Sequence, residues 1–229
     1  MSSICIITAR GGSKRIPKKN IKEFCGKPII AYSIETALAS KLFDEVMVST
    51  DSEEIAAVAR HYGAKVPFMR SEKASDDFAT TADVLQEVIK EYENRGQKFE
   101  TMCCIYPTAP FVTEDKLRKA YEKFIASDAD MLEPVVAFSF PPQRAFVIRD
   151  GLLAYRYSEH ANTRSQDLEN WYHDAGQFYF HRIESFMKQD DSQSVRIVPF
   201  ELSETEVQDI DNLTDWLLAE MKYQLMQKM

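Results

Sequence analysis

The chain has 229 residues, 45% of them hydrophobic, and a formal net charge of −8 at pH 7. This length suits one α/β domain over residues 1–229 with a sizeable core, and the acidic balance argues against a nucleic-acid partner, which favours a basic surface. No segment approaches the ~20 apolar residues of a membrane span, and the first residues lack the pattern of a secretory signal. We therefore expect a cytoplasmic protein without a membrane partner.

The four cysteines show no zinc-site pattern. Cys5, Cys103 and Cys104 lie in apolar, strand-like runs, Cys25 ends a loop, and no pair forms C-x-x-C. The four histidines show no ligand spacing with them, and a structural zinc site depends on such spacing. We therefore expect free thiols in a reducing compartment.

The stretch from Ile4 to Asn20 has two unlike halves. Residues 4–9 are apolar and rich in β-branched side chains, which is typical of a buried strand. The loop 10–20 contains Gly11, Gly12 and five cations, which are Arg10, Lys14, Arg15, Lys18 and Lys19. Glycine lets a ligand approach backbone N–H groups, so this loop is a candidate site for a nucleotide's phosphates. A solvated basic turn is the alternative. Neither G-x-G-x-x-G nor G-x-x-x-x-G-K-[ST] is present.

Residues 28–138 alternate between helix and strand patterns. We predict helices over 28–38, 52–62, 80–94 and 114–127, and strands over 43–50, 65–69, 100–106 and 131–138. Asp51 or Ser52 is expected to cap the second helix, and Thr113 the fourth. Such alternation implies right-handed βαβ units and a parallel sheet covered on both faces. Ligands bind at the carboxyl ends of such strands, so the loops 10–20 and 106–110 should meet there.

The pattern changes after residue 138. Segments 145–148 and 152–157 flank Arg149-Asp150-Gly151, which is a hairpin signal. Residues 139–175 are therefore predicted to form a small inserted β-rich lobe, and strands are predicted over 176–180 and 195–200. A closing helix from about Asn212 to Met226 is expected to pack against the body through four apolar side chains, Leu213, Trp216, Leu217 and Met221.

The cationic loop resembles a known signature. Residues 9–20 match the A-R-G-G-S-K-x-I-P-x-K-N motif of the cytidylyltransferases that activate sialic acid and related nonulosonic acids, and the similarity covers most of the chain. The resemblance implies a three-layer, mostly parallel Rossmann-like α/β fold of the nucleotide-diphospho-sugar transferase type. It also implies transfer of CMP from CTP to the anomeric hydroxyl of a nine-carbon acidic sugar, with release of pyrophosphate. Such transfer depends on positioning and charge stabilisation.

Two features bear on the identity of the sugar. The stretch 160–179 is most similar to the branch of the family that activates pseudaminic acid, and Tyr106 stands where sialic acid enzymes of the family usually have Gln. Sialic, legionaminic and deoxy-octulosonic acids are the alternatives within the family. A nucleotide-binding module without turnover and a nicotinamide oxidoreductase are alternatives of other classes. The missing glycine fingerprint counts against the oxidoreductase.

The resemblance assigns a nucleotide site to the first third of the chain. The triphosphate would be held by three cations and by three backbone N–H groups, namely Arg10, Lys14, Lys19, Gly11, Gly12 and Ser13. Asn20 would recognise cytosine, because an amide both donates and accepts. Arg70 and Thr81 would line the base and ribose. A surface ion pair is the other interpretation of Arg70.

The sugar site implied by the resemblance draws on later segments, and its residues are Tyr106, Thr108, Arg164, His173 and Gln177. Arg164 is the candidate for the sugar carboxylate, because a guanidinium group matches a carboxylate bidentately. Alternatively, Arg164 is an ordinary solvent-exposed side chain of the lobe, and His173 forms a structural hydrogen bond.

The acidic segment before the last helix is a candidate metal site. In an extended segment residues i and i+2 point to the same side, so Asp209 and Asp211 can aim two carboxylates at one point while Ile210 turns into the core. Oxygen ligands of this kind suit Mg²⁺, which completes its shell with water and substrate phosphates. The alternative is helix capping by Asp211 or Asn212.

The lobe 139–175 is also predicted to form a dimer contact. It carries aromatic residues outside the regular sheet pattern, which are Phe146, Tyr155, Trp171 and Tyr172. Exposed aromatic patches often mark interfaces, and dimers that share this lobe are what the resemblance implies. We expect a homodimer with C2 symmetry in which lobe residues lie near the partner's active site.

Overall fold

The computed structural model describes residues 1–76, 78–188 and 195–228. Its centre is a mixed sheet of strand order β11-β6-β10-β5-β1-β4, with β9 paired to β6 outside that path. The strands span β1 Ser3–Thr8, β4 Glu45–Ser49, β5 Thr101–Ile105, β6 Met131–Ala137, β9 Tyr172–Asp174, β10 Phe178–Arg182 and β11 Ile197–Glu201. β1 is parallel to β4 and β5, and β11 is parallel to β6, whereas β9 and β10 are antiparallel to their neighbours.

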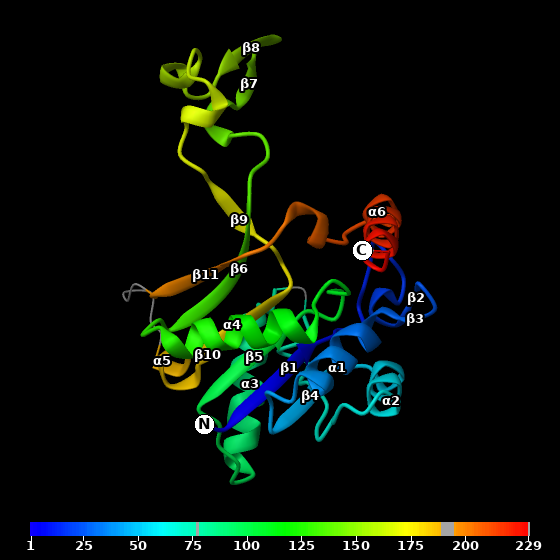
Figure 1. The fold of residues 1–229 in the computed structure, drawn as a ribbon. Coiled ribbons are helices and arrows are strands. Elements are labelled where there is room, and N and C mark those ends of the chain that lie inside the picture. The colour runs from blue at the N-terminus through cyan, green and yellow to red at the C-terminus, as the bar shows by residue number, and fades with distance from the viewer. Residues whose placement is uncertain (77, 189–194, 229) are drawn as a thin grey trace.

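Helices cover both faces of this sheet, as Figure 1 shows. They span α1 Ile29–Ser40, α2 Glu53–His61, α3 Thr81–Asn94, α4 Glu114–Ala126, α5 Ile183–Lys188 and α6 Leu213–Met226. Side chains alternate between the faces of a strand, so Cys5 and Ile7 of β1 pack with α1, α2 and α4, while Ile4 and Ile6 pack with α3 and α5. The predicted three-layer α/β fold with a mainly parallel sheet is confirmed.

Side-chain caps start four of the helices. Ser52 accepts a hydrogen bond from the Ile55 N–H and caps α2, and Thr113 accepts from Lys116 and caps α4. Thr80 forms a capping box with Asp83 at α3, and Asn212 forms one with Asp215 at α6. Each cap satisfies backbone donors that lack a partner within the helix. Helix α1 follows a short hairpin, β2 Glu23–Phe24 and β3 Lys27–Pro28.

The prediction of a strand over residues 65–69 is wrong. Only a single bridge forms there, between Met47 and Lys65, and the Lys65 N–H donates to the Val46 carbonyl at 2.9 Å. Pro67 follows two residues later. Since proline has no N–H to donate, it cannot continue the ladder.

The prediction of the buried face of α6 is wrong for three of its four residues. Leu213, Leu217 and Met221 are 59%, 61% and 67% exposed, whereas Trp216 and Ala219 are buried. The Trp216 ring meets the Phe24 ring edge-on, with 5.5 Å between centroids. The apolar residues of α6 are distributed around all sides of the helix. Their spacing therefore does not tell which side faces the body.

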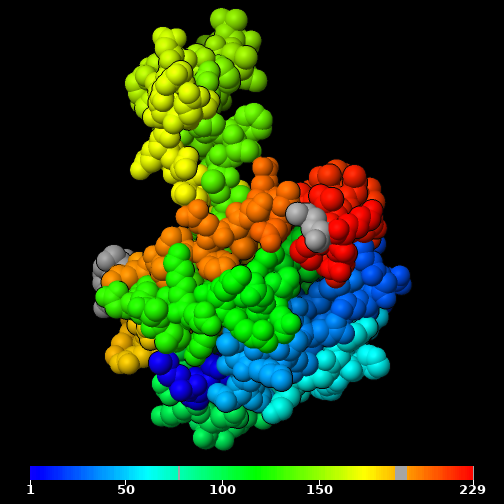
Figure 2. All heavy atoms as spheres, in the orientation of Figure 1, coloured from blue at the N-terminus to red at the C-terminus, as the bar shows by residue number. Residues whose placement is uncertain are grey.

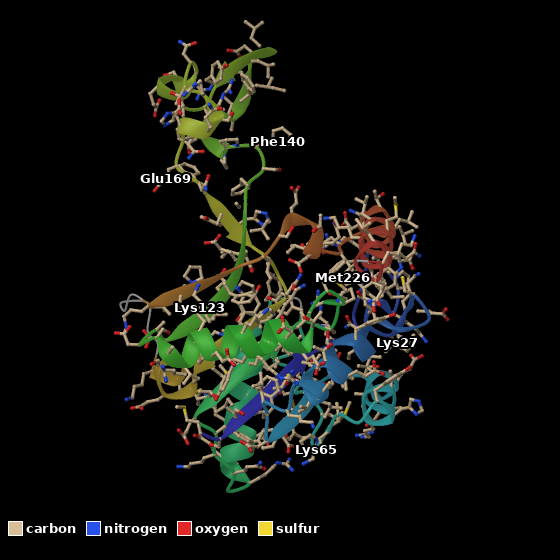
Figure 3. The ribbon with its side chains drawn as sticks, viewed as in Figure 1. Lys27, Lys65, Lys123, Phe140, Glu169 and Met226 are labelled. Atoms are coloured by element: carbon tan, nitrogen blue, oxygen red, sulfur yellow. The ribbon has the colours of Figure 1, made fainter. Side chains whose placement is uncertain are left out.

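The inserted lobe stands away from the rest of the molecule (Figures 1 and 2). Its hairpin consists of β7 Phe146–Arg149 and β8 Leu152–Tyr155, which pair antiparallel as predicted. Asp150 and Gly151 both have positive φ, 51° and 78°, as a two-residue type I′ turn requires. Phe140 and Glu169 mark the two connections to the body (Figure 3). The Gln143 side chain joins these connections by donating to the Glu169 carbonyl at 2.7 Å.

The hairpin leaves large apolar side chains in solvent. Those more than half exposed are Phe146, Ile148, Leu152 and Leu153. In the part of the chain that the structure covers, none of the helices combines the length and the hydropathy that crossing a membrane requires.

Candidate active site

One cavity lies where β1 and β5 end, at the carboxyl edge of the parallel strands. It has a volume of about 480 Å³ and brings together most of the residues predicted to bind substrate. Those that line it are Arg10, Ser13, Lys14, Lys19, Asn20, Arg70, Thr81, Tyr106, Thr108, Asp209 and Asp211. Parallel strands bring their following loops to one edge, so the loops 10–20 and 106–110 meet as expected. We call this the nucleotide cavity.

Gly11 of the basic loop is less open than predicted, whereas Gly12 is exposed and a Cβ there would meet nothing within 4 Å. The Gly11 N–H donates to Asp51 Oδ1 at 2.7 Å, and the Ser13 N–H donates to the Gly11 carbonyl at 3.0 Å. A Cβ on Gly11 would lie 3.1 Å from Ser52 Cβ. The absence of a side chain at Gly11 therefore lets this loop pack against the start of α2, and phosphate binding by the Gly11 and Ser13 N–H groups would need the loop to rearrange.

Two side chains that are predicted to contact the base form hydrogen bonds within the protein itself. Asn20 is buried and donates from Nδ2 to the Arg10 carbonyl at 2.9 Å. Arg70 is also buried and donates to the Ser49 hydroxyl and carbonyl, at 3.0 and 2.6 Å. These bonds rule out the surface ion pair considered for Arg70. They hold both side chains against the wall of the nucleotide cavity.

Cations of the basic loop contact the acidic segment at the wall of the cavity. Arg15 Nη2 lies 2.9 Å from Asp211 Oδ1. Lys19 Nζ donates to the Ile210 carbonyl at 2.6 Å and lies 4.0 Å from Asp211 Oδ1. Burial lowers the pKa of Lys19, while Asp211 and Asp209 act to raise it. The loop and the segment 209–211 therefore form one charged surface.

The structure separates the two interpretations of the acidic segment. Asn212 caps α6, since its Oδ1 accepts from the Thr214 and Asp215 N–H groups at 2.8 and 3.1 Å. Ile210 is 1% exposed and turns into the core as predicted. Asp209 and Asp211 both line the nucleotide cavity, so neither is needed as the cap.

Two carboxylates beside a group of cations fit Mg²⁺ together with a phosphate ligand, because Mg²⁺ typically takes one or two protein carboxylates and fills its shell with phosphate oxygens and water. Within residues 1–76, 78–188 and 195–228, no group of three or more His, Cys, Asp or Glu side chains could hold a metal without such help. A Mg²⁺ ion at Asp209 and Asp211 would thus bind more weakly without the nucleotide than with it.

A second cavity of about 440 Å³ adjoins the first, and we call it the sugar cavity. Tyr106 and Asp209 line both cavities, and His173 lines the second. His173 Nδ1 lies 2.8 Å from the Asp174 carbonyl oxygen. The structural hydrogen bond considered for His173 is therefore present, although His173 also lines the cavity.

Two predicted sugar residues lie outside both cavities. Gln177 is 2% exposed, and its Nε2 donates to the Glu206 carbonyl at 2.6 Å, so it supports the segment before Asp209. Arg164 lies in the lobe and pairs with Asp167, at 2.8 and 3.1 Å. Within one chain, Arg164 does not meet the other sugar residues.

Sequence reasoning missed Asp174 and Lys222, which line the sugar cavity, and Tyr179 behind Tyr106. Lys222 Nζ donates to the carbonyls of Glu204 and Val207, at 3.1 and 2.7 Å. The spacing of residues in the sequence does not predict that α6 contacts the segment 204–207. For Asp174 a signal was present, because an Asp two residues before Gly is typical of a local side-chain turn.

A cationic loop and two carboxylates that line one cavity, at the carboxyl edge of the parallel strands, define a nucleotide-binding α/β protein. The chain belongs to the cytidylyltransferase family, whose profile matches residues 4–227. Pseudaminic acid cytidylyltransferase of Campylobacter jejuni subsp. jejuni is 45% identical over 226 residues, which cover 98% of this chain and 97% of the relative.

Two further comparisons are more distant. The CMP-N,N'-diacetyllegionaminic acid synthase of Legionella pneumophila is 42% identical over 125 residues, 53% of each chain. A solved structure of CMP:2-keto-3-deoxy-manno-octonic acid synthetase complexed with CTP has a TM-score of 0.72 at 18% identity, with 100% of both chains covered. At that identity the likeness establishes the fold alone.

Proposed function

We propose that this enzyme transfers CMP from CTP to the anomeric hydroxyl of pseudaminic acid and releases pyrophosphate. The observation that carries the proposal is the pair of adjoining cavities that share Tyr106 and Asp209. One cavity has the cations that a triphosphate needs, and the other has room for the acceptor. The 45% identity to a pseudaminic acid cytidylyltransferase and the Tyr at position 106 favour this sugar.

Arg10, Lys14 and Lys19 bind the triphosphate and stabilise the charge that develops during transfer. Asn20, Arg70 and Thr81 orient the cytidine. The anomeric hydroxyl enters from the sugar cavity, and its oxygen forms the bond to the α-phosphorus as the bond to pyrophosphate breaks and the hydroxyl proton is released to water. Asp209 and Asp211 would hold Mg²⁺, which when bound neutralises phosphate charge.

A second subunit completes the sugar site in this proposal. Arg164 lies in the lobe, away from the cavities of its own chain, while a guanidinium group is the best match for the sugar carboxylate. A C2 dimer would place Arg164 of each lobe at the partner's sugar cavity. The exposed apolar hairpin of the lobe supports burial against another chain. We place the dimer in the cytoplasm, where CTP is available.

Pyrophosphate release tests the function. Purified protein with CTP and Mg²⁺ is given pseudaminic, legionaminic, N-acetylneuraminic or deoxy-octulosonic acid, one at a time. The highest kcat/KM is expected with pseudaminic acid. Binding of CTP without release for every acid would instead support a nucleotide-binding module without turnover.

A further inference from the structure

Lys222 of α6 lies where three residues that line the sugar cavity come together. Its Nζ donates to the carbonyl oxygens of Glu204 and Val207, at 3.1 and 2.7 Å. Lys222, Glu204 and Val207 all line this cavity, so the ammonium group lies at the cavity wall. The two hydrogen bonds also join α6 to the segment that leads to Asp209.

Both groups that accept from Lys222 are neutral. Within the part of the chain that the structure describes, no carboxylate forms an ion pair with Lys222. An ammonium group has three N–H donors, and the two carbonyls use two of them. The carbonyls therefore hold Lys222 in place while its third donor and its positive charge are left for a ligand.

The other charged side chains of the sugar cavity favour an anionic ligand only at Lys222. Among the described residues that line this cavity, Lys222 is the single lysine or arginine, whereas Asp174, Glu204 and Asp209 carry carboxylates. Both oxygens of Asp174 already accept hydrogen bonds within the protein. Like charges brought together cost free energy, so an acidic ligand is best placed with its anionic group at Lys222.

We infer that Lys222 binds the carboxylate of the acidic sugar in the sugar cavity. The remaining N–H of Nζ donates to one carboxylate oxygen, and a hydrogen bond between two ions is roughly twice as strong as one between neutral groups. This inference rests on the proposed function and deepens it. Each chain supplies Lys222 to its own sugar cavity, and the other carboxylate oxygen is left for Arg164 of the partner subunit.

Steady-state kinetics of Lys222→Met test this role, because the substitution removes the charge and keeps an unbranched side chain. Loss of one charged hydrogen bond should raise KM for the sugar ~10- to 100-fold and leave KM for CTP within about twofold. Lys116→Met is the matched control. Lys116 pairs with Glu206 at 2.9 Å and so anchors the same segment, but it is not among the residues that line either cavity. The control should leave both KM values close to those of the wild type.

The C1 amide of the same sugar separates recognition of the charge from damage to the segment. The amide lacks the negative charge and keeps the hydroxyl groups. The wild type should prefer the acid to the amide in kcat/KM, and Lys222→Met should reduce this preference ~10-fold, mainly through poorer use of the acid. Because the preference is compared between two enzymes, the difference in reactivity between acid and amide cancels.

Two results would overturn the inference: an unchanged preference for the acid in Lys222→Met, or equal losses of kcat/KM in Lys222→Met and Lys116→Met. Wild-type turnover is measured first with each acid of the panel, and the acid that is used serves as the probe. If none is used, the proposed function fails, and the role of Lys222 with it. Normal wild-type turnover with the same KM in Lys222→Met removes only the role of Lys222.

Discussion

Arg15 Nη2 lies 2.9 Å from Asp211 Oδ1, so a cation of the basic loop contacts a carboxylate proposed to bind Mg²⁺. The two residues are 196 positions apart in sequence, and their pair closes one side of the nucleotide cavity. A metal ion at Asp211 would have to replace Arg15, which could then turn toward the triphosphate.

Arg15→Ala should therefore strengthen metal binding in the absence of CTP. The Arg15 side chain is 68% exposed, so loss of this pair should change the free energy of unfolding by no more than ~1 kcal/mol. Electron paramagnetic resonance of free Mn²⁺ measures the affinity directly, without turnover. Unchanged Mn²⁺ affinity would mean that Arg15 does not compete with the metal.

Asp211→Ala and Asn212→Ala form a matched pair at adjacent positions. Asp211→Ala should abolish Mg²⁺-dependent turnover and leave the melting temperature little changed, because Asn212 is the cap. Asn212→Ala should cost ~1 kcal/mol of stability and keep most of the activity. Thermal unfolding and pyrophosphate release are measured for both. A destabilised but active Asp211→Ala would place the metal elsewhere.

Arg10→Ala and Lys14→Ala should each cost about 2–4 kcal/mol of transition-state stabilisation, the range for one preorganised electrostatic donor. Lys18→Ala is the control within the same loop, since Lys18 pairs with Glu54 at 2.7 Å on the surface. The control should keep kcat/KM for CTP close to the wild-type value. If Lys18→Ala were as damaging as Arg10→Ala, general loop disorder would explain all three losses.

Asn20 should make the enzyme choose CTP over UTP. Its Nδ2 is held by the Arg10 carbonyl, which leaves Oδ1 as an acceptor for the base. Cytosine presents an amino donor at position 4, whereas uracil presents a carbonyl acceptor there, as thymine does. The kcat/KM values for CTP and UTP are compared in the wild type and in Asn20→Ala. Equal values for CTP and UTP in the wild type would remove Asn20 from the base site.

If each active site of the dimer combines the body of one chain with the lobe of its partner, two inactive variants should complement each other when they are mixed. In a mixed dimer of Arg164→Ala and Asp211→Ala, one site would combine an intact body with the partner's intact lobe. Random exchange of subunits should then restore activity to about a quarter of the wild-type level. Turnover after mixing and sedimentation velocity are the measurements. A monomer at micromolar concentration, or no recovery in a proven dimer, would place Arg164 outside the site.

Much of the fold and part of the site could be predicted from local chemistry. Capping residues such as Thr113 and Ser52 start their helices where expected, because a cap is a contact between near neighbours in sequence. The loops after β1 and β5 meet because parallel strands place them at one edge. These predictions needed only periodicity and the rules for connecting strands and helices.

Long-range contacts set the limits of such prediction. The spacing of Leu213 and Leu217 fits an apolar helix face, but the side that is buried depends on where Phe24 lies in the fold. Gln177 looks like a polar residue near a substrate, yet its amide supports the Glu206 carbonyl 29 residues away.

The choice of sugar is measured most directly by competition. The enzyme is given CTP, Mg²⁺ and an equimolar mixture of pseudaminic, legionaminic, N-acetylneuraminic and deoxy-octulosonic acids, and the CMP-sugars are quantified by mass spectrometry. Product ratios under these conditions report the ratios of kcat/KM. CMP-pseudaminic acid is expected to be the main product. A different CMP-sugar as the main product, or CTP consumed without any CMP-sugar, would contradict the proposed function.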